Sequence, residues 1–336
     1  MADLPLISTS PHIHQSATTR KIMAWVLVAL APSAVWSVVL FGWRSALLIA
    51  VTVAASVLTE ALLNLAFRKK NTVDDLSAVV TGVLIAFNMP PSVPLFIPVV
   101  AAFFAIAVVK WSFGGLGANW MNPALAGRVF VFFSWGTDMT TWTLPRLGGA
   151  DMVTGATPLG SIKVAMQNLP SGVDGPMRLL ESAGMPTTYM DLFLGKIPGS
   201  LGEMSALLLI AGALLLIALK IVDWEIPVFY LGGFALIVWV FDGLQYGSGW
   251  FSGDVLFHLF SGGIMLGALF MATDMVTTPL TKKGRIIFAL GCAFFTFLLR
   301  HFSNLPEGVS LAIIFMNILV PLIDRATKPK RYGAAV

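Results

Sequence analysis

The chain contains little charge and a single cysteine. Only 11% of its 336 residues are charged and 57% are hydrophobic, whereas a soluble globular protein has roughly 25% charged residues. This composition excludes a soluble domain and indicates a polytopic membrane protein. Cys292 lies inside an apolar run, so the chain has neither a disulfide framework nor a cysteine cluster for zinc or for iron and sulfur. Any redox centre must therefore be held by other side chains.

Histidine is also scarce, with four residues in the chain. His12 and His14 would supply only two metal ligands without nearby partners, which makes a poor site. His258 and His301 do not by themselves indicate haem. We therefore predict no metal site from the sequence.

Positive charge slightly exceeds negative charge, with 21 Lys and Arg against 17 Asp and Glu. In a soluble protein this surplus would suggest a nucleic-acid partner. Here the cations gather in short loops between apolar runs, which is the pattern of membrane topology. We therefore expect membrane lipid around the chain and no nucleic acid.

The apolar runs predict about ten transmembrane helices, because a crossing needs about 20 apolar residues. They lie near residues 22–40, 45–66, 76–89, 94–110, 122–135, 204–222, 226–242, 254–272, 286–302 and 309–324. With the N-terminus in the cytoplasm, fourteen Lys and Arg fall inside, six fall outside, and Arg128 lies within a span. This bias predicts that both termini are cytoplasmic and that the long loop 136–203 lies on the outer face.

An internal repeat divides the chain into two halves. The recurring elements are Leu76-Ser77, Gly82 and Pro94-Leu95, matched by Phe260-Ser261, Gly267 and Pro279-Leu280, and also Lys110-Trp111-Ser112, matched by Arg300-His301-Phe302. Five crossings per half would invert the second half relative to the first, as in many transporters, and we expect a ligand where the halves meet. The predicted organisation is a cytoplasmic tail 1–21, a first five-helix repeat 22–135, the outer-face loop 136–203, a second five-helix repeat 204–324 and a cytoplasmic tail 325–336. Some helices, such as the one ending at Pro90-Pro91, are short or broken.

Thr157 ends the string Asp151-Met152-Val153-Thr154-Gly155-Ala156-Thr157 within the long polar loop. Its hydroxyl has two readings: it stabilises a turn, or it forms an ester with a phosphate-bearing cofactor. The residues alone favour the turn. A phosphate would need positive partners, and Arg146 and Lys163 are the nearest cations in the loop, although both could equally be solvated surface charges.

Acidic residues in apolar surroundings are costly, and we expect most of them to lie at the membrane interface. The acidic residues concerned are Glu60, Asp74, Asp75, Asp242, Asp254, Asp274, Glu307 and Asp324. Asp274 ends a glycine-rich span near Thr277, where a carboxylate and hydroxyls could coordinate a small cation or cap a tight turn. Asp75 leaves the same two alternatives open, because an acid is stabilised at a helix N-terminus without any other role.

The whole chain resembles the RnfD family, the membrane subunit of the Rnf electron-transport complex, which is related to the NqrB subunit of the sodium-translocating quinone reductase. The resemblance rests on Ser10-Pro11-His12, the segment Asp75 to Gly82, Gly114-Gly115-Leu116-Gly117 with Asn122-Pro123-Ala124, the string Asp151 to Thr157, the segment Ala272 to Pro279, and Pro306-Glu307-Gly308-Val309 with Met316-Asn317. The short N-terminal tail is closer to RnfD than to NqrB.

The resemblance implies that Thr157 carries FMN through a phosphoester. Asp151, Thr154, Gly155 and Ala156 would then be the frame that a dedicated flavin transferase recognises. It also implies an all-α polytopic fold of ten helices in two inverted repeats, similar to urea and ammonium transporters. The implied location is the bacterial or archaeal cytoplasmic (inner) membrane.

The function implied by the resemblance is electron transport within a multi-subunit translocase, an ion-transporting ferredoxin:NAD oxidoreductase, in which this chain has no complete active site of its own and no catalytic residue. Partner subunits would carry iron-sulfur centres and flavins, and Na⁺ or H⁺ would be moved. The residues that we expect to line an ion path or to hold a second flavin, riboflavin, are Asp75, Asn122, Asp274, Thr277 and Glu307. The alternatives are an NqrB-type subunit, a channel or transporter of the same fold without flavin, and a structural scaffold for the other subunits.

Overall fold

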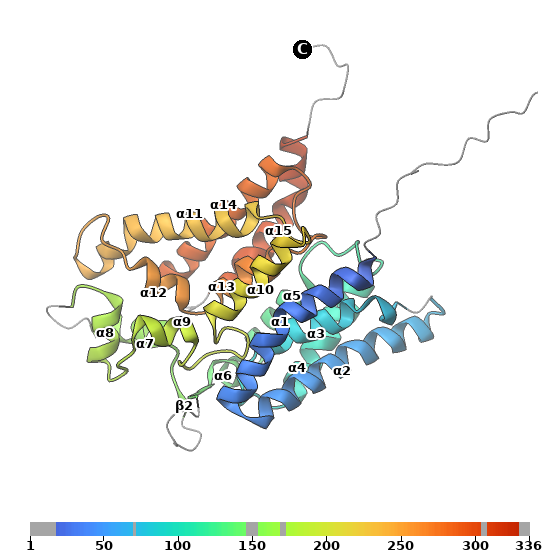
Figure 1. Cartoon of the computed structure of the whole chain (residues 1–336), viewed down its shortest axis with the longest axis horizontal. Coiled ribbons are helices and arrows are strands. Elements are labelled where there is room, and N and C mark those ends of the chain that lie inside the picture. Colours follow the sequence, from blue (N-terminus) through green and yellow to red (C-terminus); the bar gives the residue numbers. More distant parts are fainter. Residues whose placement is uncertain (1–17, 70–71, 146–153, 169–172, 304–307, 329–336) are drawn as a thin grey trace, which may run out of the picture.

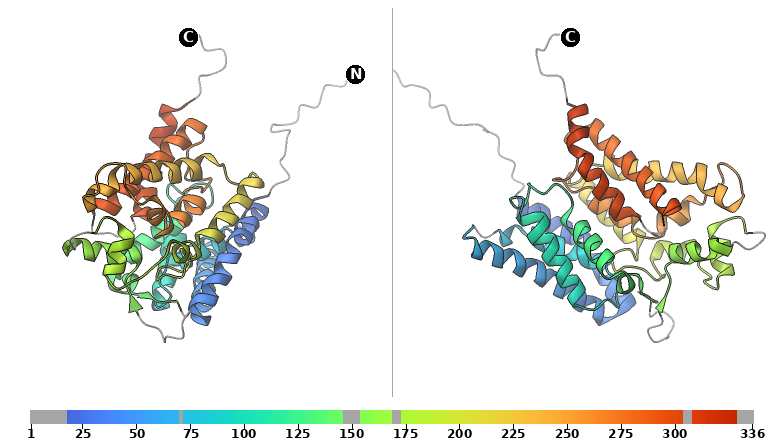
Figure 2. Two further views of the ribbon diagram at one scale, coloured as in Figure 1. Left: turned by 60° about the vertical axis from the view of Figure 1, so that its left-hand side comes forward. Right: turned by 180° about the vertical axis from the view of Figure 1, so that it is seen from behind.

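Helices dominate the structure, a computed structural model that describes residues 18–69, 72–145, 154–168, 173–303 and 308–328 (Figure 1). The predicted sites Asp151, Arg146 and Glu307 lie outside the described residues. The part of the chain before the long connection forms one bundle, and the part after it forms a second bundle beside the first (Figures 1 and 2).

The first bundle is built from two long helices followed by shorter ones. Its elements are α1 (Thr19–Phe41), α2 (Trp43–Ala66), η1 (Val73–Asp75), α3 (Ser77–Phe87), α4 (Phe96–Phe103), the π-helical η2 (Phe104–Trp111) and α5 (Pro123–Ser134). The Thr18 hydroxyl caps α1 by accepting a hydrogen bond from the Lys21 backbone N–H. Gly42, at φ 82°, ends α1 in a conformation that glycine adopts readily, so that α2 folds back directly.

Short elements form the connection between the bundles. They are α6 (Gly136–Thr140), β1 (Trp142–Thr143), β2 (Thr154–Gly155), α7 (Pro158–Ala165), η3 (Met166–Asn168), α8 (Pro176–Ser182) and α9 (Tyr189–Leu194). Strands β1 and β2 pair antiparallel, with Trp142 opposite Gly155 and Thr143 opposite Thr154. A small apolar core of its own, which includes Leu159, Ile162 and Leu179, holds α7 and α8 against Phe257 of the second bundle.

The second bundle again combines long and broken helices. Its elements are α10 (Ala206–Ala218), α11 (Glu225–Phe241), η4 (Asp242–Tyr246), α12 (Val255–Phe260), α13 (Ile264–Leu266), the π-helical η5 (Gly267–Met271), α14 (Lys282–Phe302) and α15 (Val309–Ala326). Helix α10 packs on α1, and α11 packs on α14. The sequence predicts one helix over 254–272; the structure divides it into α12, α13 and η5, because the chain leaves the helical path at Ser261 and Gly262, the latter at φ 68°.

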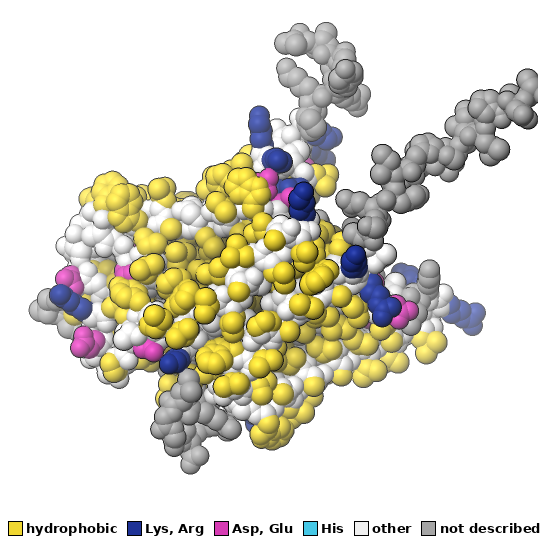
Figure 3. Space-filling model, viewed as in Figure 1, with side chains coloured by type: hydrophobic (Ala, Val, Ile, Leu, Met, Phe, Trp, Pro, Cys, Tyr) yellow, Lys and Arg dark blue, Asp and Glu magenta, His cyan; other side chains and the backbone are white. Residues whose placement is uncertain are grey.

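Among the residues that the structure describes, five helices are long and apolar enough to cross a membrane: α1, α2, α11 with η4, α14 and α15. Shorter apolar helices accompany them at 77–87, 96–111, 123–134 and 206–218. Apolar side chains spread over most of the face shown in Figure 3, while Lys and Arg gather beside the start of α1 and the end of α15. The chain is therefore a multi-pass membrane protein.

The break after α3 is stabilised by hydrogen bonds from other segments. At membrane depth every backbone polar group needs a partner within the protein. Arg44 donates to the carbonyls of Pro91, Ser92 and Val93 at 3.1, 2.9 and 3.2 Å. At the end of α3, the carbonyls of Phe87 and Met89 accept from the N–H groups of residues 202 and 201 at 2.8 and 3.1 Å. The end of the long connection therefore completes the first bundle.

We expect Gly82→Ala to destabilise the fold, because a Cβ at this position would lie 2.7 Å from the Val53 Cα of the neighbouring helix α2. Overpacking of this kind costs about 1–3 kcal/mol. Gly232→Ala is the matched control, since a Cβ there meets nothing within 4 Å and alanine favours the helix. The thermal unfolding midpoint in detergent should fall for the first variant and not for the second. Equal midpoints would show that α2 and α3 are not packed this closely.

Candidate functional site

Thr157 is the N-cap residue of α7. Its Oγ1 accepts a hydrogen bond from the Gly160 backbone N–H at 3.1 Å, and the residue is 5% exposed. Pro158 follows at the first helical position, where its fixed φ suits a helix start. The turn that the residues predict is therefore present, and it presents the hydroxyl oxygen at the N-terminus of a helix.

The start of α7 also has the features of a phosphate site. The N–H groups of the first turn carry partial positive charge, and such helix ends bind phosphate without needing side chains. A side chain at position 160 would bring its Cβ within 3.2 Å of the Thr157 Oγ1. Glycine at position 160 therefore leaves room around the oxygen that a phosphoester would use.

The residues directly before Thr157 make few contacts that the structure describes. Thr154 and Gly155 form β2, whose pairing with β1 fixes the path of the chain into α7. Ala156 is exposed, and a Cβ at Gly155 would meet Leu144 only at ordinary contact distance, 3.6 Å. The described part of the predicted recognition frame is thus held by a short strand pair, with Ala156 exposed.

Lys163 lies near the other end of α7, six residues after Thr157. Its ammonium donates to the Ser303 carbonyl, after α14. Burial, together with the positive charge of Arg300, lowers the pKa of the Lys163 ammonium. The structure therefore places Lys163 against α14 and not at the N-terminus of α7.

A cavity of about 550 Å³ lies between α7 and the second bundle. Gly160, Ile162 and Lys163 line one wall. The opposite wall carries polar and charged groups of the second bundle, namely Asp242, Gln245, His258, Arg300 and His301. The segment that follows Thr157 therefore faces a space large enough for a ligand, next to buried titratable groups.

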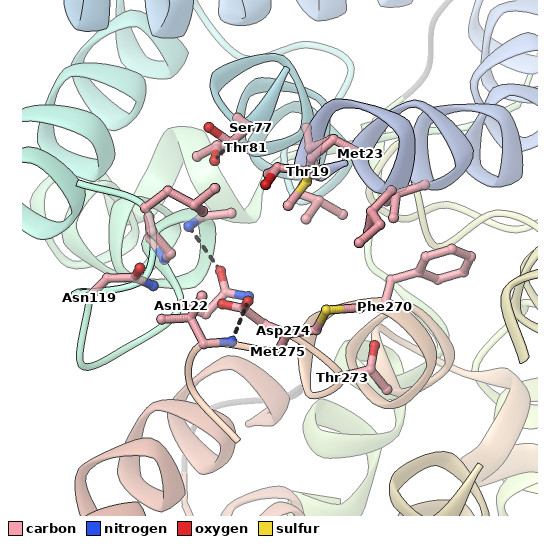
Figure 4. Close-up of a pocket in the computed structure, with 18 of the residues that line it drawn as sticks. Thr19, Met23, Ser77, Thr81, Asn119, Asn122, Phe270, Thr273, Asp274 and Met275 are labelled. Atoms are coloured by element: carbon pink, nitrogen blue, oxygen red, sulfur yellow. Dashed lines mark hydrogen bonds between the residues drawn. The ribbon is translucent and has the colours of Figure 1, made fainter. Parts of the chain in front are cut away.

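A second cavity, of about 240 Å³, lies where the two bundles meet (Figure 4). It is lined by residues from both, among them Ser77, Thr81, Lys110, Asn119, Asn122, Phe270, Thr273 and Asp274. Asn122 and Asp274, which are far apart in sequence, both line this cavity. Most of the remaining lining is apolar.

Amide side chains join the two bundles beside this second cavity. Asn122 caps α5 through its Oδ1 and donates from Nδ2 to the Met271 carbonyl at 3.1 Å. Asn317 accepts from the Asn122 N–H at 3.3 Å and donates to the Thr277 carbonyl at 3.0 Å. The side chains of Asn122 and Asn317 therefore lock η5 and the segment after it onto α5.

Asp274 and Asp75 both stabilise turns in the structure. Asp274 accepts from the Val276 N–H at 3.2 Å and from the Thr277 hydroxyl at 3.3 Å. Asp75 accepts from the Ser77 N–H at 2.7 Å, at the start of α3. Stabilising a local turn is thus an observed role for both, and Asp274 in addition lines the second cavity.

A buried ion pair joins α2 and η2 in the first bundle. Glu60, on α2, is 3% exposed and forms an ion pair with Lys110 of η2, with 2.7 Å between Oε2 and Nζ. Lys110 is equally buried and also donates to the Ser77 hydroxyl at 2.6 Å. The pair is stable in this apolar setting because each charge neutralises the other.

Asp242 is also buried, with 1% of its surface exposed. Its Oδ1 lies 2.9 Å from Nε2 of His258 and 3.0 Å from Nε2 of His301. Beside it, Arg300 donates to the carbonyls of His258 and Ser261 at 2.7 and 3.0 Å. The sequence did not predict the Glu60–Lys110 pair or the group around Asp242, because the partners come from separate helices. The charged residues within apolar runs were the only available signal.

Comparison with known proteins gives consistent matches over nearly the full length. The model of the NQR2, RnfD, RnfE family matches residues 6–333. The chain is 42% identical over 328 residues to the D subunit of the proton-translocating ferredoxin:NAD(+) oxidoreductase complex of Clostridium ljungdahlii, covering 97% of this chain and 96% of the relative. It is 44% identical over 329 residues to the D subunit of the Na(+)-translocating ferredoxin:NAD(+) oxidoreductase complex of Acetobacterium woodii, covering 97% and 95%.

We expect Lys110→Met or Glu60→Gln alone to destabilise the protein strongly, because each leaves the partner buried without its counter-charge, a loss of about 3–5 kcal/mol. The double variant should recover much of the loss. Arg178→Gln, which breaks an exposed pair with Asp174, is the control and should change little. Unfolding midpoints of the four proteins form the test, and additive losses in the double variant would contradict the pairing.

Proposed function

Because the chain belongs to the NQR2, RnfD, RnfE family, we propose that it is the D subunit of an Rnf-type complex. In this proposal it is an integral-membrane flavoprotein within an oxidoreductase that couples electron transfer between ferredoxin and NAD to the translocation of Na⁺ or H⁺. The names of its relatives, which combine these activities, support the proposal. They also favour the Rnf complex over the quinone reductase and over an unmodified channel of the same fold.

The proposed cofactor is FMN bound covalently at Thr157. The observation that carries this assignment is the position of the Thr157 Oγ1 at the N-terminus of α7, with the Gly160 N–H already directed at it. When bound, the flavin would supply a one-electron relay. Attachment would be the work of a flavin transferase that reads the segment before Thr157.

The chain's own residues would hold the phosphate. Loss of the hydroxyl proton in ester formation leaves the Thr157 oxygen able to accept from Gly160 as it does now. The first-turn N–H groups of α7 would stabilise the phosphate charge. Leu159 and Ile162, packed with Phe257, would hold the start of α7 in place on the second bundle.

Two inverted five-helix repeats remain our proposal for the architecture. In the first bundle Lys110 reaches the hydroxyl of Ser77, and in the second Arg300 reaches the carbonyl of Ser261. These are corresponding positions in the repeat that the sequence suggests. An acid, Glu60 or Asp242, is buried in each half as well.

We place both termini in the cytoplasm and Thr157 on the outer face of the cytoplasmic membrane, where partner subunits would reach the flavin.

A second proposed role concerns the 240 Å³ cavity between the bundles. Its mixed lining, with Asn122 and Asp274 beside apolar side chains such as Phe270, suits either an ion route or a further flavin, riboflavin. Thr277 lies next to Asp274 as a hydrogen-bond partner. Asp75 takes part only indirectly, through Ser77.

We expect Thr157→Ala to abolish covalent flavin and Thr157→Ser to retain it, because both serine and threonine supply an ester-forming hydroxyl. Thr188→Ala is the matched control, since Thr188 caps α9 in the same connection and its loss removes a helix cap but no proposed attachment site. Flavin fluorescence of the denatured chain in a gel reports the result. Fluorescence retained in Thr157→Ala would contradict the assignment.

We expect Asp274→Asn to reduce coupled ion transport in vesicles, because it removes the carboxylate charge from the cavity while leaving acceptor capacity for the turn. Thr281→Ala, which removes the side-chain cap of α14, serves as the control. Electron flux and assembly of the complex are measured alongside transport. Unchanged transport in an assembled Asp274→Asn complex would rule out the proposed ion route.

A further inference from the structure

Asp242, His258 and His301 converge from three separate elements, η4, α12 and α14. Their ligand atoms, one from each side chain, all lie within 4.8 Å of one another. The three side chains are 1%, 6% and 3% exposed. Two imidazoles and a carboxylate are therefore buried together, at the wall of the 550 Å³ cavity that α7 faces.

His301 is oriented as a metal ligand would be. Its Nδ1 lies 3.1 Å from the Phe297 carbonyl oxygen, which can only accept, so Nδ1 carries the hydrogen. Nε2 of the neutral ring then presents a lone pair toward the Asp242 Oδ1, 3.0 Å away. Two lone pairs at this distance repel unless a positive charge lies between them. Metal-binding histidines commonly donate their other ring N–H to a backbone carbonyl in this way.

His258 gives independent support. Its Nε2 is only 2.9 Å from the Asp242 Oδ1, yet neither ring nitrogen makes a hydrogen bond to any part of the chain that the structure describes. Two donors that share one zinc ion at about 2.0–2.2 Å also lie roughly 3 Å apart, with each lone pair directed at the ion and not at the other donor.

The carboxylate is held in place by its other oxygen. Asp242 Oδ2 accepts from the Asp254 N–H at 3.3 Å, and Asp254 itself caps α12 by accepting from the Phe257 N–H at 3.0 Å. Hydrogen-bonded carboxylates of this kind are typical of ordered metal sites. Oδ1 is thereby left to face the two imidazoles.

The two bundles neutralise their buried acids differently. Glu60 meets the permanent positive charge of Lys110. Asp242 meets the imidazoles of His258 and His301, two groups that can share a bound cation with the carboxylate.

We propose that Asp242, His258 and His301 bind one divalent transition-metal ion. The ligand atoms are Nε2 of both histidines and Oδ1 of the aspartate. Two nitrogens and one carboxylate oxygen suit zinc, and they also form the donor set of non-haem iron(II) sites. Water from the cavity that the three residues line would complete the coordination. The ion ties η4, α12 and α14 together beside α7.

The first test is the metal content of the full-length chain purified in detergent without chelators, measured by inductively coupled plasma mass spectrometry. We expect about one zinc or iron ion per chain, the stoichiometry of a single site. His258→Gln, His301→Gln and Asp242→Asn should each lower the content by at least about tenfold. The double variant His12→Gln/His14→Gln, which removes the other two histidines, is the matched control and should keep the ion.

A second measurement does not depend on the folding of the variants. Wild-type chain stripped with a chelator is titrated with Zn²⁺ alone, and separately with Co²⁺, whose visible absorption reports nitrogen and oxygen ligands directly. Saturable binding at one site per chain supports the proposal. A wild-type chain that contains no metal and binds neither ion would overturn it and leave a proton as the charge in the cluster. Full metal content in all three ligand variants would overturn it as well.

Discussion

The structure depends on neutralising buried charge where short helices begin inside an apolar protein. Lys110 pairs with Glu60 and reaches Ser77 at the start of α3. In the second bundle Arg300 bonds the carbonyls of His258 and Ser261, where α12 ends and α13 is about to begin. Without these contacts, the breaks would leave charges and backbone groups without partners in a medium that cannot solvate them. Lys110 and Arg300 also line the two cavities, one in each case.

The proposed sites lie beside the breaks in the helices. The end of the connection returns to bond α3 through residues 201 and 202, so the loop that carries Thr157 is anchored to both bundles. Its helix α7 rests on the second bundle through Phe257 and faces the Asp242 cluster across the larger cavity. The smaller cavity lies between the bundles, where Asn122 and Asn317 hold η5. A proposed flavin site, an interface cavity and a proposed metal site thus share one framework of broken helices.

The features that depend on local pattern could be predicted from the sequence. Long apolar runs placed α1 and α2, and Asn122-Pro123 marked the start of α5, because an N-cap followed by proline needs no tertiary context. The resemblance identified the family. The burial of Glu60 and Asp242 could not be predicted, since their partners are 50 and 59 residues away in Lys110 and His301. The division of 254–272 also depends on packing, because glycines within an apolar run are compatible with a continuous helix.

Thr157 is, in our proposal, the covalent flavin site of an Rnf-type subunit. The most direct measurement is the mass of the proteolytic peptide that contains Thr157, taken from chain produced with and without the flavin transferase. We predict that the peptide gains the mass of an FMN phosphoester only when the transferase is present, with fragmentation placing it on Thr157. An unmodified peptide under both conditions, or flavin on another residue, would contradict this assignment.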